Sequence, residues 1–599
     1  MDAMVEQDVC SGTTIRLGFR FSARASHGAC LVGNGRDGFR LEAWSFRERH
    51  ADMWLLPTTS IEPLHTHLVP IEDGRVVLIR YGRGIREVAV ASPAGERPLE
   101  TVDSPALRAL PSRDPATLVW LVAAHREDHS VIHQVSADDM RVQPVLDVPG
   151  QLSGGWWLNE AGDLLAANQV LSGKRRIVIL DLRHGTVTPL PEQAGGVLLT
   201  SPRRGEILVA ARNSDGIGLG RVSPSDTRVR FFRALDRLTG TVLPLTLDPE
   251  GRRLALRVAQ GAVSRLLIYD VATDTVTEVP CPPGVIRDAG WSETGLRVLF
   301  SSPATPAAVV RITEPFERRQ AEGSATFCGH DARLEQFDGP AGPVEAVVYG
   351  EDWRRSRHVL VALHGGPEAA WELTFEPVFQ RLADAGITIV APNQRGSTGY
   401  GAAHRDAIKG CWGGPDLADI RHLLATLLRE RRHPGCRIPM LFGVSYGAFL
   451  ALLAAAADPT GWSRCVAVAP FVSGAALYTD GPASVRSLLD RLGGRAEIDD
   501  DLGPRDLLRL APRITAPVLL VHGERDEVIP VAHSRLLARR LGAAGRRAAA
   551  LFRYQEIPHA GHDPFVGPQG SALVEDVVAF LLTPPRLVHP RAAVAGSVR

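Results

Sequence analysis

The stretch Gly443-Val444-Ser445-Tyr446-Gly447 decides the fold of the second half of this 599-residue chain. An apolar run, Ile438–Val444, precedes it, and an alanine-rich run, Tyr446–Ala457, follows it. A G-x-S-x-G sequence between a buried strand and a helix is typical of the sharp turn that exposes a serine hydroxyl. Glycines fit at both ends because side chains there would collide with neighbouring backbone. Ser445 is therefore predicted to be a nucleophile at a helix N-terminus, where backbone N–H groups can receive negative charge.

Around this motif, from about residue 340 onward, buried strands alternate with helices. The expected strands are His358–Leu363, Ile387–Ala391, Ile438–Val444, Cys465–Ala469 and Pro517–Val521, and the expected helices are Pro377–Ala385, Leu417–Arg429 and Tyr446–Ala457. Such alternation predicts an open, mostly parallel sheet that is covered by helices on both faces. Sheets of this kind place their chemistry at the carboxyl ends of the strands. The second half is thus predicted to be an α/β-hydrolase domain.

A serine hydroxyl needs a neighbouring base, which is itself oriented by an acid. In this fold the chain order is serine, acid, histidine. Asp526 follows a long apolar strand and is the favoured acid, with Glu524 and Glu527 as competitors. His559 and His562 both follow the last expected strand, and either could be the base. We favour His562 because it follows a glycine and lies closest to the terminal helix.

A fourth component is His364-Gly365-Gly366-Pro367, which comes directly after the strand at 359–363. A glycine pair lets a backbone N–H approach a substrate carbonyl. The predicted oxyanion hole combines the N–H of Tyr446, the residue after the nucleophile, with an N–H of the Gly365-Gly366 turn. The reaction that these groups predict is acyl transfer through an acyl-enzyme.

The half before about residue 310 has a different pattern, in which short apolar runs are separated by polar turns. Four of these turns place a glycine just before an apolar strand, at residues 162, 205, 251 and 295. A second marker agrees, because Asp181 with Thr186-Val187-Thr188 recurs as Asp270 with Thr275-Val276-Thr277. A period in the forties is typical of the four-stranded blades of a β-propeller. Similar turns near Gly74 and Pro115, and a poorer one near Gly35, extend the count to about seven blades. The alternative is an unrelated β-rich domain.

The predicted division is an N-terminal extension over 1–20, a β-propeller over 21–315, an α/β-hydrolase domain over 316–585 and a disordered tail over 586–599. The boundary between the two large domains falls in a segment, 313–343, where proline and glycine are frequent.

Composition excludes several classes of protein. Hydrophobic residues make up 45% of the chain and charged residues 22%, as in folded globular proteins. Lys plus Arg number 67, as do Asp plus Glu, so the zero formal net charge argues against a nucleic-acid binder. The uncharged segment 438–457 contains proline and glycines, which favours a buried element over a membrane span.

The seven cysteines are scattered and form no CxxC pair, which favours reduced thiols, and the N-terminus lacks a signal-peptide pattern. These features predict a cytoplasmic protein. No motif for a cofactor or a metal stands out. The expected partner is a short peptide or small acyl substrate, without nucleic acid or membrane, and the sequence leaves a homo-oligomer open.

Taken together, the motifs resemble the prolyl oligopeptidase family of serine peptidases, and within it the acylaminoacyl-peptidase branch. The resemblance is carried by GVSYG, by the 81 residues between Ser445 and Asp526, by the 36 between Asp526 and His562, and by two further segments. These segments are Asn393-Gln394-Arg395-Gly396-Ser397-Thr398-Gly399-Tyr400-Gly401 and Trp412-Gly413-Gly414 with Asp416 and Asp419. His364 indicates the branch, because the prolyl-oligopeptidase and dipeptidyl-peptidase branches carry a tyrosine there.

The resemblance implies that Ser445 is the nucleophile, His562 the general base and then acid, and Asp526 its orienter. It also implies that Tyr446 and Gly366 supply the oxyanion N–H groups. A propeller that caps the active site would admit only short peptides or small acyl compounds.

One departure from the family pattern concerns substrate binding. Relatives commonly carry an arginine two residues after the catalytic aspartate, where it holds a substrate carbonyl, but this chain has Val528. Valine donates no side-chain hydrogen bond. The first hypothesis is a peptidase of short, N-blocked or free peptides. The alternatives are an ester or thioester hydrolase, acyltransferase or peptide cyclase with the same triad, and a non-catalytic propeller module with a decayed hydrolase domain.

Overall fold

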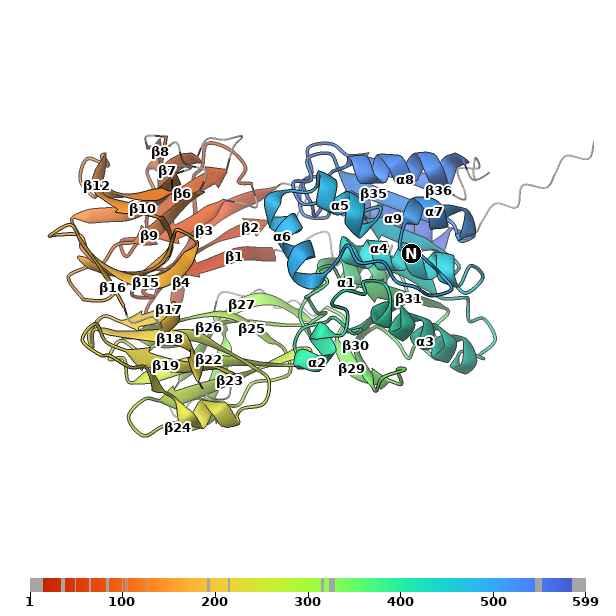
Figure 1. Cartoon of the computed structure of the whole chain (residues 1–599), viewed down its shortest axis with the longest axis horizontal. Coiled ribbons are helices and arrows are strands. Elements are labelled where there is room, and N and C mark those ends of the chain that lie inside the picture. The colour runs from red at the N-terminus through yellow and green to blue at the C-terminus, as the bar shows by residue number, and fades with distance from the viewer. Residues whose placement is uncertain are drawn as a thin grey trace, which may run out of the picture. The chain divides into compact units, whose positions relative to one another are not determined.

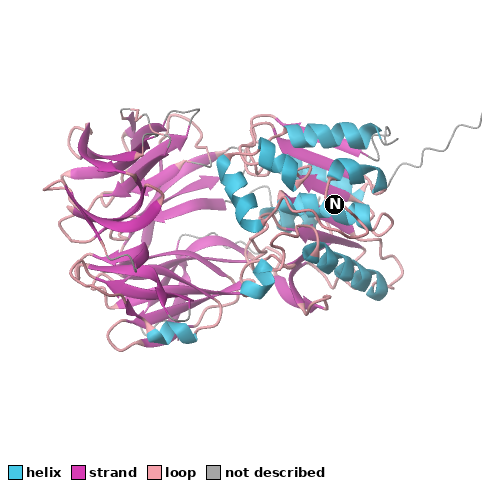
Figure 2. Cartoon of the chain, in the orientation of Figure 1, coloured by secondary structure: helices cyan, strands magenta, loops and turns pink. Residues whose placement is uncertain are grey.

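The computed structural model divides the chain into two compact units. One comprises Met1–Gly329 with Glu372–Glu376, and the other comprises His330–Trp371 with Pro377–Arg599. Strands dominate the first unit and most helices belong to the second (Figure 2). The residues that the structure describes are 15–33, 38–48, 50–63, 66–81, 86–99, 101–102, 104, 106–125, 128–190, 194–213, 216–313, 317–322, 329–543 and 552–583. The predicted tail over 586–599 and the first fourteen residues lie outside them.

In the described residues, the first unit forms seven four-stranded antiparallel sheets, each built from one continuous stretch of chain. The first three blades are β1 (Ile15–Phe21), β2 (His27–Gly33), β3 (Phe39–Phe46) and β4 (Ala51–Leu56); β5 (His67–Pro70), β6 (Val76–Tyr81), β7 (Arg86–Ser92) and β8 (Gly95–Pro98); and β9 (Ala106–Pro111), β10 (Thr117–His125), β11 (His129–Ser136) and β12 (Val142–Pro149).

The next four blades are β13 (Gln151–Trp157), β14 (Leu164–Leu171), β15 (Lys174–Asp181) and β16 (Thr186–Pro189); β17 (Ala194–Ser201), β18 (Glu206–Asn213), β19 (Gly216–Val222) and β20 (Arg230–Phe231); β21 (Thr241–Leu247), β22 (Arg253–Gln260), β23 (Val263–Asp270) and β24 (Thr275–Val279); and β25 (Val285–Ser292), β26 (Gly295–Ser302), β27 (Thr305–Thr313) and β28 (Glu317–Glu322). A 3-10 helix, Arg233–Arg237, follows β20. Figure 1 labels many of these strands in red to green.

The blades form a closed ring, because the first strand of each blade contacts the first strand of the next and β25 contacts β1. Apolar side chains fill the interfaces between blades, as where the rings of Trp120 and Trp157 lie 5.8 Å apart. The prediction of a β-propeller with about seven blades is therefore confirmed.

The turn between the first and second strands of a blade explains why glycines mark several blades in the sequence and why the first blade lacks this marker. Gly162, Gly205 and Gly251 occupy this turn with φ angles of 72°, 62° and 66°, where a side chain would be strained. In the first blade Ala25 takes this conformation instead, with φ 51°. The glycine marker is thus missing there, and the turn that the sequence placed near Gly35 falls outside the described residues. Without this marker the sequence placed residues 15–20 in an N-terminal extension, whereas in the structure they form most of β1.

The second unit is built on an eight-stranded sheet with the order β29-β30-β32-β31-β33-β34-β35-β36. Its strands are β29 (Ala332–Phe337), β30 (Val344–Tyr349), β31 (His358–Leu363), β32 (Ile387–Pro392), β33 (Met440–Val444), β34 (Cys465–Val468), β35 (Val518–Gly523) and β36 (Phe552–Ile557). The six strands from β32 to β36 in this order are parallel, and β29 and β30 run antiparallel at one edge. The predicted α/β-hydrolase fold is confirmed, although β28 extends the propeller beyond the predicted boundary at 315.

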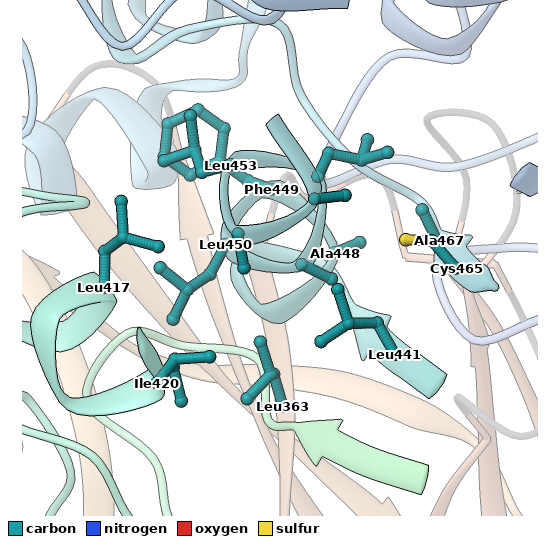
Figure 3. Packing of buried hydrophobic residues seen from close by; sticks show 14 of the residues in the cluster. Leu363, Leu417, Ile420, Leu441, Ala448, Phe449, Leu450, Leu453, Cys465 and Ala467 are labelled. Atoms are coloured by element: carbon teal, nitrogen blue, oxygen red, sulfur yellow. The ribbon is translucent and has the colours of Figure 1, made fainter. Parts of the chain in front are cut away.

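The helices are α1 (Pro377–Asp384), α2 (Ala402–Asp406), α3 (Pro415–Glu430), α4 (Tyr446–Ala457), α5 (Gly474–Asp480), α6 (Ala483–Leu492), α7 (Leu507–Leu510), α8 (Ala532–Ala543) and α9 (Gly570–Leu582), with a 3-10 helix at Ala511–Arg513. The core of the unit surrounds α4, which is buried from Tyr446 to Ala456. Figure 3 shows Leu450 of α4 near Leu417 and Ile420 of α3. A helix buried on all sides is apolar on all sides, which explains the uncharged segment at 438–457.

In the described ranges no helix combines the length and apolar character needed to cross a bilayer. Five described cysteines, namely Cys30, Cys281, Cys411, Cys436 and Cys465, are free thiols.

Candidate active site

Ser445 stands between the end of β33 and the first residue of α4, in a backbone conformation that L-residues rarely adopt. Its φ and ψ angles are 57° and −120°, and its N–H donates a 2.8 Å hydrogen bond to the carbonyl of Val468. The flanking glycines make this turn possible. A Cβ on Gly443 would lie 2.2 Å from the carbonyl oxygen of Gly447, and a Cβ on Gly447 would lie 2.2 Å from that of Leu363. Strained backbone of this kind is found where a fold holds a reactive group in place.

The acid and the base predicted from the sequence are in direct contact. Nδ1 of His562 lies 2.7 Å from Oδ2 of Asp526. The Asp526 side chain is fully buried, and its Oδ1 accepts hydrogen bonds from the N–H groups of Val528 and Ile529 at 2.8 and 2.9 Å. Burial alone would raise the pKa of Asp526, but hydrogen bonds from His522 and His562 outweigh it and hold the pKa well below its usual range. Asp526 is thus a charged acceptor for the His562 ring.

His522 is a residue of this site that the sequence analysis did not single out. Its fully buried ring places Nε2 at 3.1 Å from Oδ2 of Asp526 and 2.9 Å from the carbonyl of Ile529, and Nδ1 at 2.7 Å from the hydroxyl of Ser534. The ring therefore supports both the catalytic-acid candidate and the loop that follows it. His522 could have been identified in the sequence by its position at the end of the strand that leads to Asp526.

The competing residues pair with each other instead. The His559 N–H donates a 2.9 Å hydrogen bond to Oε2 of Glu524, and the His559 ring, which is 70% exposed, lies 3.4 Å from the same oxygen. Glu527 is exposed. Of the alternatives left open by the sequence, the geometry brings together Asp526 and His562.

Ser445, Asp526 and His562 follow β33, β35 and β36, whose carboxyl ends share one edge of the sheet. Within the described residues the Ser445 hydroxyl makes no hydrogen bond to the His562 ring, which is 28% exposed. Catalytic hydrogen bonds of unliganded enzymes are often long and tighten only when substrate binds. The sheet thus supplies a common edge, and the acid–base pair is already formed there.

The glycine turn after β31 lies against the serine. A Cβ on Gly365 would be 3.3 Å from Cβ of Ser445 and 3.9 Å from its Oγ. Gly366 is exposed and has a φ of 122°. In the described part of the chain, the backbone N–H groups of Tyr446 and Gly366 donate to no protein group. Two free donors beside a partly exposed serine are the arrangement that an oxyanion hole requires.

His364 fixes this turn through its ring. Nδ1 lies 2.7 Å from the Gly365 carbonyl and Nε2 lies 2.8 Å from the Ser397 hydroxyl. Burial lowers the pKa of His364 to about 4, so the ring is neutral near pH 7 and we assign the proton to Nδ1. The Gly365 carbonyl and the Gly366 N–H belong to one planar peptide group and point in opposite directions. By holding the carbonyl, His364 sets the direction of the candidate oxyanion donor.

The described residues contain no group of three or more His, Cys, Asp or Glu side chains that could hold a metal ion.

The fold and this arrangement define the class: an α/β-hydrolase with its serine on a strand-to-helix turn, preceded in the chain by a seven-bladed propeller. Residues 373–583 match the model of the prolyl oligopeptidase family, which confirms the predicted resemblance.

Three relatives illustrate the similarity. The Bacillus subtilis protein named "Uncharacterized peptidase YuxL" is 26% identical over 213 residues, which cover 34% of this chain and 31% of that protein. Pyrococcus horikoshii acylaminoacyl peptidase has a TM-score of 0.74 at 15% identity and covers 97% of each chain. A Mycobacterium tuberculosis puromycin-hydrolyzing peptidase has a TM-score of 0.72 at 18% identity and covers 96% of this chain and 95% of that one.

At these identities the solved structures establish the fold alone. The chain aligns with about a third or less of the length of the curated relatives it matches. Their names accordingly bear on activity only as support for a proposal.

The strained turn gives a first prediction. Gly447→Ala should abolish activity because the new Cβ would meet the Leu363 carbonyl, and neither backbone can yield without displacing Ser445. Gly542→Ala in α8 is the matched control, since a Cβ there meets nothing within 4 Å. Labelling by a fluorophosphonate probe measures the outcome. Equal labelling of Gly447→Ala and wild type would contradict the argument.

The buried ring of His364 gives a second prediction. Its pKa of about 4 is lower than the 6.5 of a free histidine, so the unfolded chain binds the additional proton. The folded state therefore loses stability as pH falls from 6.5 to 4, by about 2 kcal/mol at pH 5. His364→Gln should remove this part of the difference between pH 7 and pH 5 in urea unfolding. An equal difference between pH 7 and pH 5 in His364→Gln and in the wild type would refute the assignment.

Proposed function

We propose that the protein is a serine peptidase that cleaves short peptides through an acyl-enzyme on Ser445. The observation that carries this proposal is the 2.7 Å contact between His562 and the buried, charged Asp526, at the sheet edge where Ser445 is held. Tyr446 and Gly366 serve as the oxyanion donors. The names of the solved relatives, an acylaminoacyl peptidase and a puromycin-hydrolyzing peptidase, support peptide substrates.

The reaction uses each group in turn. Ser445 Oγ attacks the carbonyl carbon of the scissile bond while Nε2 of His562 accepts the hydroxyl proton. The N–H groups of Tyr446 and Gly366 receive the negative charge that develops on the carbonyl oxygen. The imidazolium, stabilised by Asp526, then donates its proton to the leaving amine. Water, activated by the same ring, hydrolyses the acyl-enzyme and restores the serine.

We further propose that the enzyme works in the cytoplasm. The five described cysteines are free thiols, which fits a reducing compartment. Its substrates are short peptides, N-blocked or free at the amino end.

The nucleophile is tested by labelling and turnover together. A fluorophosphonate should label the wild type and fail to label Ser445→Ala, because the probe reacts with an activated serine. Turnover of acyl-peptide and aminoacyl anilides should fall at least a thousandfold in Ser445→Ala and His562→Ala. His559→Ala is the control and should keep wild-type turnover. Hydrolysis of simple esters with refusal of every anilide would instead support the ester-hydrolase alternative.

Val528 gives a test of substrate binding separate from the chemistry. Its backbone N–H donates to Asp526, and the residue itself is 39% exposed. Val528→Arg should therefore leave fluorophosphonate labelling within twofold of wild type. It should lower KM for peptides about tenfold, since a charged donor to a carbonyl contributes roughly 1.5–3 kcal/mol. Loss of labelling, or an unchanged KM, would show that this position does not face the substrate.

A further inference from the structure

Asp416 is a fully buried carboxyl group that the reaction described above does not use. It lies in the first turn of α3, and its Oδ2 accepts a 2.5 Å hydrogen bond from the hydroxyl of Tyr446. The N–H of Leu417 donates to Oδ1 at 2.9 Å, and the N–H of Gly413 approaches Oδ2 at 3.4 Å. The carboxylate therefore serves as an anchor point for the far end of the Tyr446 side chain.

The Tyr446 ring is held over its whole length. It is 2% exposed and meets Trp412 edge-on, with ring centroids 5.0 Å apart and an interplanar angle of 80°. Phe449 and Phe471 lie at 6.0 and 6.3 Å. A side chain fixed by packing along the ring and by a hydrogen bond at its tip restricts the rotation of its own backbone.

That backbone matters because the Tyr446 N–H is one of the two candidate oxyanion donors. It belongs to the peptide group that joins Tyr446 to the strained Ser445. A donor stabilises a transition state only if it is already aimed at the developing charge. Because the side chain and the backbone of Tyr446 are joined at its Cα, fixing the side chain also restricts the direction of that peptide group. Asp416 fixes the tip of this side chain.

Stability alone does not account for a carboxyl group at this place. Burial raises the pKa of Asp416 to about 6 in spite of the hydrogen bonds from Tyr446, Leu417 and Gly413. A raised pKa means that the charged form is disfavoured in its surroundings, so the carboxylate weakens the folded state at neutral pH. Apolar replacements of buried polar pairs are often neutral or stabilising. A role in positioning explains the pair better than a role in folding.

We propose that Asp416 is a positioning residue of the oxyanion hole, which acts through the Tyr446 hydroxyl to aim the Tyr446 backbone N–H at the carbonyl oxygen of the substrate. This inference rests on the proposed peptidase function and deepens it. Because the oxyanion forms only in the transition state, a misaimed donor lowers kcat and leaves KM nearly unchanged.

A double-mutant cycle tests the proposal in the full-length protein. Asp416→Asn and Tyr446→Phe should each lower kcat for an acyl-peptide anilide about tenfold, a fraction of the 10²–10³ lost when an oxyanion donor is removed outright. KM should stay within twofold. The double variant should be no slower than the slower single variant, because both substitutions act on one hydrogen bond: asparagine weakens it by removing the charge of the acceptor, and phenylalanine removes the donor.

Asp419→Asn is the matched control. Asp419 is buried one turn further along α3 and pairs with Arg395, with Nη2 of Arg395 at 2.7 Å from its Oδ1 and the side chain 2% exposed. It has no hydrogen bond to Tyr446 within the described residues. Its effect on kcat should multiply with that of Tyr446→Phe, as for independent sites.

The inhibition constant of a tetrahedral inhibitor distinguishes a positioning role from a purely structural one, because a purely structural role would leave this constant unchanged. The inhibition constant of a peptide boronate should rise in Asp416→Asn by the same factor by which kcat/KM falls, while thermal midpoints stay within a few degrees of wild type. Wild-type kcat in both single variants, multiplicative effects in the double variant, or a change confined to KM would overturn the proposal. If Ser445→Ala retained wild-type turnover, the peptidase function itself would fail, and that result is distinct from any of these.

Discussion

The hydrolase unit depends on one backbone constraint, the left-handed conformation of Ser445 between β33 and α4. The turn exists only because two neighbouring residues lack side chains, since a Cβ at Gly443 or Gly447 would lie 2.2 Å from a carbonyl oxygen. Burial of α4 on every side stabilises the strained turn, because the helix cannot shift without opening the core around Leu450. The burial of apolar side chains in this core thus holds Ser445, the proposed nucleophile, in a backbone conformation that it would rarely adopt in a peptide.

Buried polar groups extend this constraint to the groups around the serine. His364 holds the Gly365 carbonyl, Asp526 accepts from two N–H groups of its own loop, and Asp416 holds the Tyr446 hydroxyl. In each case a side chain that is costly to bury fixes a backbone segment that the proposed reaction uses. The candidate site is therefore organised less by contacts among Ser445, Asp526 and His562 than by buried polar side chains that hold the backbone around them.

Local signals carried most of what the sequence could predict. Both ends of α4 follow from Ser445 at its start and Asp458-Pro459 after its end, and the blades of the propeller follow from repeated glycine turns. The first blade was marked only by a poorer turn near Gly35, because Ala25 adopts the left-handed turn between its first two strands without a glycine. The bond between Asp416 and Tyr446 spans thirty residues and that between His522 and Asp526 lies outside any helix, so neither leaves a periodic trace. Such contacts are set by the packing of the folded chain.

In the loop after β35, the backbone supports Asp526 while the side chain of one residue stays exposed. The backbone N–H groups of Val528 and Ile529 hold the Asp526 carboxylate, and any residue other than proline at 528 can supply the first of them. Val528 is 39% exposed, whereas Ile529 is 2% exposed and anchors the loop in the core. Substitution at 528 can therefore change an exposed side chain of this loop while Asp526 keeps its geometry. Under the proposed function, this division lets the chain keep the contact between Asp526 and His562 without the arginine that the family resemblance leads one to expect at this position.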